Sequence, residues 1–291
     1  MILDHKSCTI AVTEKKVGIV ILNWNGWKDT VCCVLSLSSL SYKNYFVIII
    51  DNASSDNSVE EIEKALPHVK IVVNDRNRGF GGGCNPGIRA ALDMKADFVW
   101  LLNNDTVVRK ETLTAMAEEI ESENLVGAVG SVLYYMDNPD KVQAWGGGYV
   151  NSLLGVSKHL YEKPQRKSKL HYLTGASLLI RSEVLNSVGF FDEKFFMYWE
   201  DVDLGFRIRQ NNWKICVAEK SILLHKESAS LGRKSPLLTR YLNQSAIIFF
   251  RKHFIFWQWP VFIGIFGRLV KKILQRDWSG FNAILSVLLR R

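Results

Sequence analysis

The chain has 291 residues, of which 47% are hydrophobic and 23% charged, and its formal net charge is +8. These values exclude an intrinsically disordered protein and predict one large domain, or one domain with an appendage. The five cysteines are odd in number and form no Cys-x-x-Cys pair, which argues against a disulfide framework and favours the reducing cytoplasm. The first ten residues do not resemble a signal sequence, and no uncharged apolar run is long enough to span a membrane.

Apolar strands alternate with helical patterns through the first half of the chain. Strands are predicted at 17–23, 45–51, 69–73 and 97–102, and helices at 27–40, 58–66, 84–94 and 109–123. This alternation predicts an α/β fold with a mostly parallel sheet that is covered by helices on both faces. The segment 134–171 is predicted to be an insertion of loops, followed by a strand at 176–180, a helix at 200–210 and a strand at 214–218.

Polar residues follow each of the first four predicted strands. The strands end at Asn23, at Asp51, at Asn74 and at the run Asn103-Asn104-Asp105. Ligands of open parallel sheets bind beyond the carboxyl ends of the strands, so these side chains are expected to converge on one crevice. The alternative is that they are ordinary turn formers.

A glycine-rich segment at 76–83 is expected to be a loop that lets a diphosphate approach the backbone. Neither the GxGxxG nor the GxxxxGK[ST] fingerprint is present, which argues against dehydrogenases and P-loop enzymes. Asp105 is a candidate ligand for Mg²⁺ or Mn²⁺, and the alternative is a cap for the following helix.

The segment 190–210 combines five carboxylates with seven aromatic residues. Asp203 and Arg207 stand four residues apart and are expected to pair on a helix. Asp201 has no such cation, so its carboxylate is a candidate general base for a hydroxyl nucleophile. Tyr198 and Trp199 are candidates for stacking on a sugar. The alternative is an acidic helix start with the aromatic rings in the core.

The ordered set of motifs resembles the family 2 glycosyltransferases of the GT-A fold, and within them the rhamnosyltransferase-like branch. The resemblance spans about residues 17–250 and includes a lone His225 after the last motif. The motifs are IVILNWNG (19–26), DNASSDNS (51–58), NRGFGGGCNPG (77–87), LNND (102–105), YLTGASLLIR (172–181) and GFFDEKFFMYWEDVDLGFR (189–207).

The resemblance implies an inverting transfer of a sugar from a nucleotide-sugar donor to a saccharide or lipid-linked saccharide in cell-surface polysaccharide synthesis. L-rhamnose from dTDP-rhamnose is the expected donor sugar. In this reading Asp51 binds the base or ribose of the donor, and Asn23 and Trp24 line the same wall. The remaining residues expected at the nucleotide sugar are Asn77, Gly79, Asn85, Asn103 and Asn104.

The resemblance also implies a divalent metal, Mn²⁺ or Mg²⁺, held by Asp105 with His225 as a further ligand. Asn103 stands where the family has the first Asp of its Asp-x-Asp motif, so the site has one anionic ligand fewer. Asp201 is the implied catalytic base. Trp199 and Glu200 are the residues expected at the acceptor.

The last part of the chain is apolar and basic. We expect a catalytic domain at 1–245 and a helical tail at 246–291. From residue 251 onward there are eight basic residues against one acid, Asp277, and 254–267 contains no charge. This pattern suits a helix in the membrane interface and a peripheral location on the inner face of the cell membrane. The alternative is a helical pair that packs on the catalytic domain or on a partner subunit.

Other functions fit less well. A sugar nucleotidyltransferase is expected to have a glycine-rich loop with Arg and Lys directly after its first strand, and NWNGWKD stands there instead. A nucleic-acid-binding tail is disfavoured because the aromatic residues cluster with apolar neighbours and do not interleave with Lys and Arg. A non-catalytic sugar-binding module remains an alternative.

Overall fold

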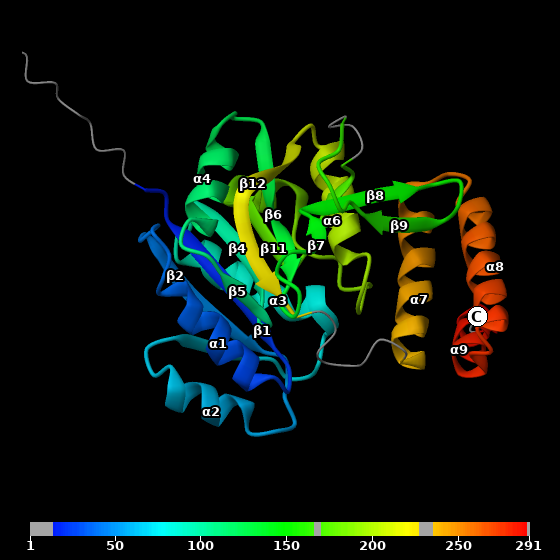
Figure 1. Ribbon diagram of the computed structural model, residues 1–291, viewed down its shortest axis with the longest axis horizontal. Coiled ribbons are helices and arrows are strands. Elements are labelled where there is room, and N and C mark those ends of the chain that lie inside the picture. Colours follow the sequence, from blue (N-terminus) through cyan, green and yellow to red (C-terminus); the bar gives the residue numbers. More distant parts are fainter. Residues whose placement is uncertain (1–13, 166–169, 227–234, 290–291) are drawn as a thin grey trace, which may run out of the picture.

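The computed structural model describes residues 14–165, 170–226 and 235–289 (Figure 1). The N-terminal ten residues with Cys8, positions 166–169 of the expected insertion, and the final Arg290 and Arg291 lie outside the described residues.

The N-terminal half of the sheet is parallel. Strand β1 lies between β2 and β4, and β3 follows β2 at the edge, with every pairing among these four strands parallel. The strands are β1 (Val17–Asn23), β2 (Tyr45–Asp51), β3 (Lys70–Val73) and β4 (Phe98–Asn103). The apolar residues of the central strands β1 and β4 are buried on both faces, as parallel strands under helices require, whereas β3 at the edge is partly exposed. These positions agree closely with the predicted strands.

The C-terminal half of the sheet is mixed. Beyond β4 the order continues β11-β6-β12-β5, and β7 pairs with β6. The β6–β12 pairing is parallel, whereas β4–β11, β11–β6, β12–β5 and β6–β7 are antiparallel. The strands are β5 (Thr106–Val108), β6 (Val126–Tyr135), β7 (Val142–Trp145), β11 (Ser177–Arg181) and β12 (Lys214–His225).

Helices cover both faces of the sheet, so the predicted α/β fold is confirmed. Residues of α1, α2 and α4 pack into the core on one face, and residues of α3, α5 and α6 pack into the core on the other. These helices are α1 (Trp27–Leu37), α2 (Ser58–Ala65), α3 (Gly79–Asp93), α4 (Thr112–Glu121), α5 (Ser182–Val188) and α6 (Glu200–Gln210).

The glycine-rich segment is helical, and the predicted loop there is wrong. Helix α3 begins at Gly79 and includes the glycines that were expected to form the loop. A Cβ at Gly83 would lie 2.8 Å from Leu22, and one at Gly87 would lie 2.5 Å from Val20. These glycines let the helix pack closely against β1, which is a packing role that the loop interpretation missed.

The segment 134–171, predicted to be loops, contains strands in its described part. After the end of β6 and β7, strand β8 (Gly147–Asn151) pairs with β9 (Val156–His159) and β10 (Tyr172–Leu173) in a small antiparallel sheet. These strands have two to five residues and several glycines. The alternation of apolar and polar residues along each strand is therefore too short to recognise in the sequence.

Three helices end the described chain: α7 (Pro236–His253), α8 (Gln258–Leu274) and α9 (Trp278–Leu289). In Figure 1, α7 lies between the sheet and α8. The expected division between residues 245 and 246 falls inside α7, whose Phe249 and Phe250 are fully buried. Within the described residues, no helix combines the length and the apolar character that crossing a bilayer requires.

Candidate active site

A cleft of about 510 Å³ opens beyond the carboxyl ends of β1 and β4. It brings together ten of the residues that the sequence predicted for the site. They are Trp24, Asn77, Gly79, Asn103, Asn104, Asp105, Tyr198, Glu200, Asp201 and His225. Residues from distant parts of the chain therefore meet at the edge of the sheet where the sequence analysis expected them.

Asn52, which follows Asp51 at the polar end of the second predicted strand and was given no role of its own there, organises the wall beside α3. Its Nδ2 donates to Asn77 Oδ1 at 3.0 Å and to the Gly79 carbonyl at 3.0 Å. Its Oδ1 accepts from Asn74 Nδ2 at 3.0 Å and from the Arg78 amide at 3.1 Å. This one side chain joins the end of β2 to the start of α3. The sequence signal for a position of Asn52 at the cleft was its place directly after Asp51, at the end of a predicted strand.

Asn23 and Asp51 lie behind the cleft and do not line it. Asn23 Nδ2 donates to Asp51 Oδ2 at 2.7 Å, and both side chains are almost completely buried. The Asp51 carboxylate also accepts from the Ser54 amide at 2.8 Å and from its hydroxyl at 2.7 Å. The pair fixes the ends of β1 and β2.

Asn85 is likewise directed away from the cleft. Its side chain donates to the Phe191 carbonyl at 3.0 Å and accepts from the Phe191 amide at 3.1 Å. Asn85 therefore satisfies a buried backbone turn before α6.

Asp105 and His225 meet at the mouth of the cleft. His225 Nε2 lies 3.1 Å from Asp105 Oδ1 and 3.2 Å from Asn103 Nδ2. On the other side of the ring, His225 Nδ1 lies 2.6 Å from Gln143 Oε1, an arrangement that fixes the ring orientation. Asp105 precedes β5 and caps no helix, so the alternative reading of this residue is excluded.

The donor atoms at this point fit a divalent cation. Asp105 supplies a carboxylate and His225 a ring nitrogen, and Asn103 Oδ1 is buried without a hydrogen-bond partner. The carboxylate and amide oxygens are the kind of ligand that Mn²⁺ and Mg²⁺ prefer. Among the described residues no group of three or more His, Cys, Asp or Glu side chains is placed to hold a metal. A cation here therefore needs further oxygen ligands, such as those of a diphosphate.

Glu200 and Asp201 begin α6 at the opposite wall of the cleft. Burial, followed by the charge of Asp201, raises the pKa of Glu200 well above its usual value, and Glu200 Oε2 has no hydrogen-bond partner. Burial also raises the pKa of Asp201, although the charge of His159 and backbone N–H groups oppose the shift. Asp201 accepts from the amides of Gly175 at 3.2 Å and Val202 at 2.8 Å. Of the two, Asp201 is therefore better suited to carry the negative charge.

The structure corrects the expected role of Trp199. Its ring is 3% exposed and packs on Phe249 and Phe250, with ring centroids 4.9 and 5.5 Å apart. Tyr198 lines the cleft instead and is 37% exposed. Both residues have positive φ angles, 66° and 69°, and this turn directs the two side chains differently. Such a backbone is costly for non-glycine residues and is typical of functional sites.

Asp203 holds α6 in place. Burial alone would raise its pKa, but hydrogen bonds from His253, Lys252 and Arg207 bring the pKa down to about 2. The predicted pair with Arg207 is confirmed at 2.8 Å, and His253 Nε2 lies 2.8 Å from the other carboxylate oxygen. The helix that carries Asp201 is therefore fastened to the end of α7.

Aromatic residues that the sequence analysis missed form the outer wall. The rings of Phe196 and Tyr241 stack with centroids 4.5 Å apart, and both residues line the cleft with His159. Phe196 also contacts the donor side, because its carbonyl accepts from the Phe80 amide at 2.9 Å. Tyr241 belongs to α7 and His159 to β9, two elements with no local sequence signal for a cleft.

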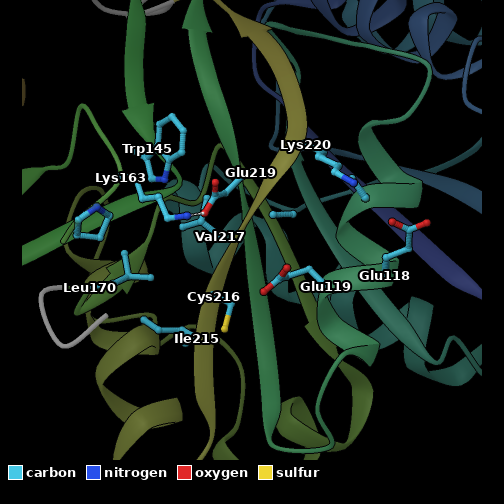
Figure 2. A pocket seen from close by; sticks show the side chains of 13 residues that line it. Glu118, Glu119, Trp145, Lys163, Leu170, Ile215, Cys216, Val217, Glu219 and Lys220 are labelled. Atoms are coloured by element: carbon cyan, nitrogen blue, oxygen red, sulfur yellow. Dashed lines mark ion pairs between the residues drawn. The ribbon is translucent and has the colours of Figure 1, made fainter. Parts of the chain in front are cut away.

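A second cavity, of about 530 Å³, lies between α4 and β12 (Figure 2). Lys163 and Glu219 form an ion pair across it at 2.6 Å. None of the residues predicted for the site lines this cavity. The strand-end cleft, which brings the predicted residues together, is therefore the better candidate for chemistry.

Comparisons with known proteins agree with this geometry. Residues 18–189 match the family described as Glycosyl transferase family 2. The N-acetylglucosaminyl-diphospho-decaprenol L-rhamnosyltransferase of Mycobacterium tuberculosis is 25% identical over 249 residues, which cover 78% of this chain and 81% of that protein. The low-salt glycan biosynthesis hexosyltransferase Agl10 of Haloferax volcanii is 23% identical over 245 residues, covering 83% and 77%.

Solved structures share the fold. The mannosyltransferase PcManGT from Pyrobaculum calidifontis, in complex with GDP-Man and Mn²⁺, superimposes with a TM-score of 0.63 at 14% identity, covering 95% of this chain and 86% of that one. GalNAc-T7 with UDP, GalNAc and Mn²⁺ gives a TM-score of 0.68 at 17% identity, covering 85% and 49%. The expected GT-A fold is thereby confirmed.

Proposed function

Because the chain belongs to glycosyl transferase family 2, we propose that it transfers L-rhamnose from dTDP-rhamnose to a saccharide or lipid-linked saccharide acceptor. The relative from Mycobacterium tuberculosis, an L-rhamnosyltransferase by name, supports the choice of sugar. The observation that carries the proposal is the cleft itself, in which Asp201 lies opposite the pair of Asp105 and His225.

The donor is assigned to the wall formed by β1, β4 and the start of α3. Trp24, Asn77 and Asn104 offer an aromatic ring and amide groups there. Asp105, His225 and Asn103 would hold Mn²⁺ or Mg²⁺, which would neutralise the developing charge of the leaving diphosphate. The two solved structures that contain Mn²⁺ support a divalent cation.

Asp201 is the proposed base. Its carboxylate takes the proton from the acceptor hydroxyl as that oxygen attacks the anomeric carbon of the sugar. The bond from this carbon to the diphosphate breaks on the opposite side, so the anomeric configuration is inverted. Two backbone N–H groups orient the carboxylate, and the partly buried position keeps its pKa above the usual value, which strengthens it as a base.

The acceptor is assigned to the aromatic outer wall. Tyr198, Phe196 and Tyr241 present ring faces toward which sugar C–H groups can pack, and Glu200 lies beneath them in the cleft. We also place the protein peripherally at the cytoplasmic face of the membrane, because a lipid-linked acceptor is anchored there. In this proposal residues 1–245 form the catalytic unit and 246–291 the tail that contacts the membrane.

A donor screen tests the proposal. dTDP-, UDP- and GDP-sugars are added with Mn²⁺, Mg²⁺ or EDTA, and thermal shift and release of nucleoside diphosphate are measured. We expect dTDP-rhamnose with metal to stabilise the protein most. NMR of the product with a lipid-linked saccharide acceptor should give an anomeric configuration opposite to that of the donor. If no nucleotide sugar binds under any metal condition, the donor assignment is wrong. Binding without any transfer would favour the sugar-binding module.

A further inference from the structure

The outer face of α8 carries a row of apolar side chains that is open to solvent. Trp259, Phe262, Phe266, Val270 and Ile273 are 60, 65, 57, 38 and 46% exposed. They recur every three or four residues and therefore lie on one side of the helix. Contiguous exposed apolar surface of this kind marks an interaction site in a soluble protein.

The opposite face of α8 is packed and locked to the rest of the protein. Pro260, Gly264 and Ile265 are buried. A Cβ at Gly264 would lie 2.6 Å from the carbonyl oxygen of Gly155, at the tip of the β8–β9 hairpin. Arg268 joins the same elements, since its Nη1 donates to that carbonyl at 3.2 Å and its Nε donates to Asn243 Oδ1 at 2.7 Å. The orientation of α8 is thus fixed, and the apolar row faces outward as a consequence.

The chain segment that carries this row is basic in composition. Residues 235–289 contain seven Lys and Arg residues and a single acid, Asp277, which pairs with Lys272 at 2.5 Å. Of the other bases, Lys252 pairs with Asp192 and Asp203, and Arg268 is held on the packed face of α8. Lys271 and Arg276 have no acidic partner within the described chain. The turn before α8 adds two further apolar side chains, Ile255 and Phe256, which are 89 and 82% exposed.

We propose that this outer face of α8 is a docking surface for an anionic lipid bilayer. Aromatic side chains enter the headgroup region, and the neighbouring cations meet the lipid phosphates. A second copy of the chain docked through the same face would bring two such basic segments together, and like charges disfavour that arrangement. This docking surface specifies which part of the protein contacts the membrane in the peripheral location proposed above. It rests on that proposal only for the choice of a bilayer as the partner.

Docking in this way fixes the distance between the bilayer and the cleft. The hairpin that packs on α8 at Gly155 runs back to His159, which lines the cleft. Figure 1 shows β8 and β9 extending from the sheet toward α8. An acceptor anchored in the bilayer is therefore presented to a cleft held at a constant height.

Vesicle co-sedimentation of the full chain tests the proposal. The probes are phosphatidylcholine vesicles with and without phosphatidylglycerol, at low and high salt. The Phe262→Asp/Phe266→Asp variant should lose about tenfold or more of the vesicle-bound fraction. Lys271→Ala/Arg276→Ala should remove the preference for phosphatidylglycerol. Leu35→Asp/Leu125→Asp, which changes two exposed leucines elsewhere, should bind like the wild type.

Circular dichroism and thermal shift with the donor establish that each variant is folded. Equal binding of the wild type and the Phe262→Asp/Phe266→Asp variant, or no vesicle binding by the wild type, overturns the proposal. A concentration-dependent dimer that this variant abolishes would assign the face to a second copy. Vesicle binding requires no turnover. Loss of vesicle binding with donor hydrolysis intact would therefore reject the docking surface alone, whereas vesicle binding without donor hydrolysis would reject the glycosyl transfer alone.

Discussion

His225 Nε2 lies 3.1 Å from Asp105 Oδ1, although one residue ends β12 and the other precedes β5. The antiparallel pairing of these two strands puts His225 opposite Thr106, the neighbour of Asp105. A single strand pairing therefore builds the proposed metal centre from two distant segments.

Replacing either member of this pair should weaken binding of the cation. We expect Asp105→Asn and His225→Gln to lower the affinity for Mn²⁺ in the presence of nucleoside diphosphate by about 100-fold or more, since even outer-shell changes cost 10- to 100-fold. Calorimetric titration measures this affinity. His68→Gln, a change at an exposed histidine, is the matched control. Unchanged Mn²⁺ affinity in both cleft variants would remove the pair from the metal site.

Asp201→Asn should abolish most of the turnover without affecting donor binding. Loss of a general base typically costs about 10²–10⁴ in rate, whereas the donor contacts belong to the opposite wall. Steady-state kinetics with acceptor and donor titration by thermal shift separate the two effects. Asp93→Asn, which removes an exposed carboxylate at the end of α3, should leave both values unchanged. Full turnover by Asp201→Asn would exclude this residue as the base.

Glu200 should make the folded protein less stable as the pH rises. Burial and the charge of Asp201 raise the pKa of Glu200 well above its usual value, so the folded state holds a proton that the unfolded state releases. The stabilising contribution is complete below about pH 4.5 and is lost as the pH rises through the folded pKa. Glu200→Gln cannot ionise and should become more stable than the wild type toward neutral pH.

Urea unfolding between pH 4 and pH 8 measures this difference. Glu63→Gln, at an exposed position of α2, is the control and should follow the wild type throughout. A constant difference between Glu200→Gln and the wild type across this range would argue against a raised pKa.

Tyr198 and Trp199 should respond in opposite ways to truncation. Trp199→Ala empties a buried position and should cost about 3–5 kcal/mol of folding free energy. Tyr198→Ala should cost less than about 1 kcal/mol, but it should raise the KM for the acceptor about threefold to tenfold if the ring stacks on sugar. Urea unfolding and acceptor kinetics test the pair. A large loss of stability in Tyr198→Ala would make this residue structural too.

The parallel strands and their polar ends were predictable because buried parallel strands have a distinctive composition. An uninterrupted apolar run such as 45–50, followed by Asp51 and Asn52, indicates both the strand and the edge of the sheet at which it ends. The ordered motifs then indicated Asp105, Asp201 and His225, and all three line one cleft.

The parts of the fold and of the cleft that were not predicted depend on tertiary contacts that no local sequence pattern encodes. Glycines at 81–83 indicate a loop by propensity, but they lie in helix α3, where Gly83 packs against Leu22 of β1 and Gly81 against Phe191. Trp199 and Tyr198 are adjacent and chemically similar, and only two positive φ angles decide which ring enters the core. Tyr241 reaches the cleft because α7 packs beside α6, far from any motif.

The fastening of α6 by α7 has a consequence for the order in which the nascent chain matures. Asp203 pairs with Lys252 and His253, and Trp199 packs on Phe249 and Phe250. At ribosomal rates of about 5–20 residues per second, these partners emerge several seconds after α6 itself. The sheet can form before that moment, but the carboxylate at the cleft is held in position only when nearly all of the chain has been synthesised.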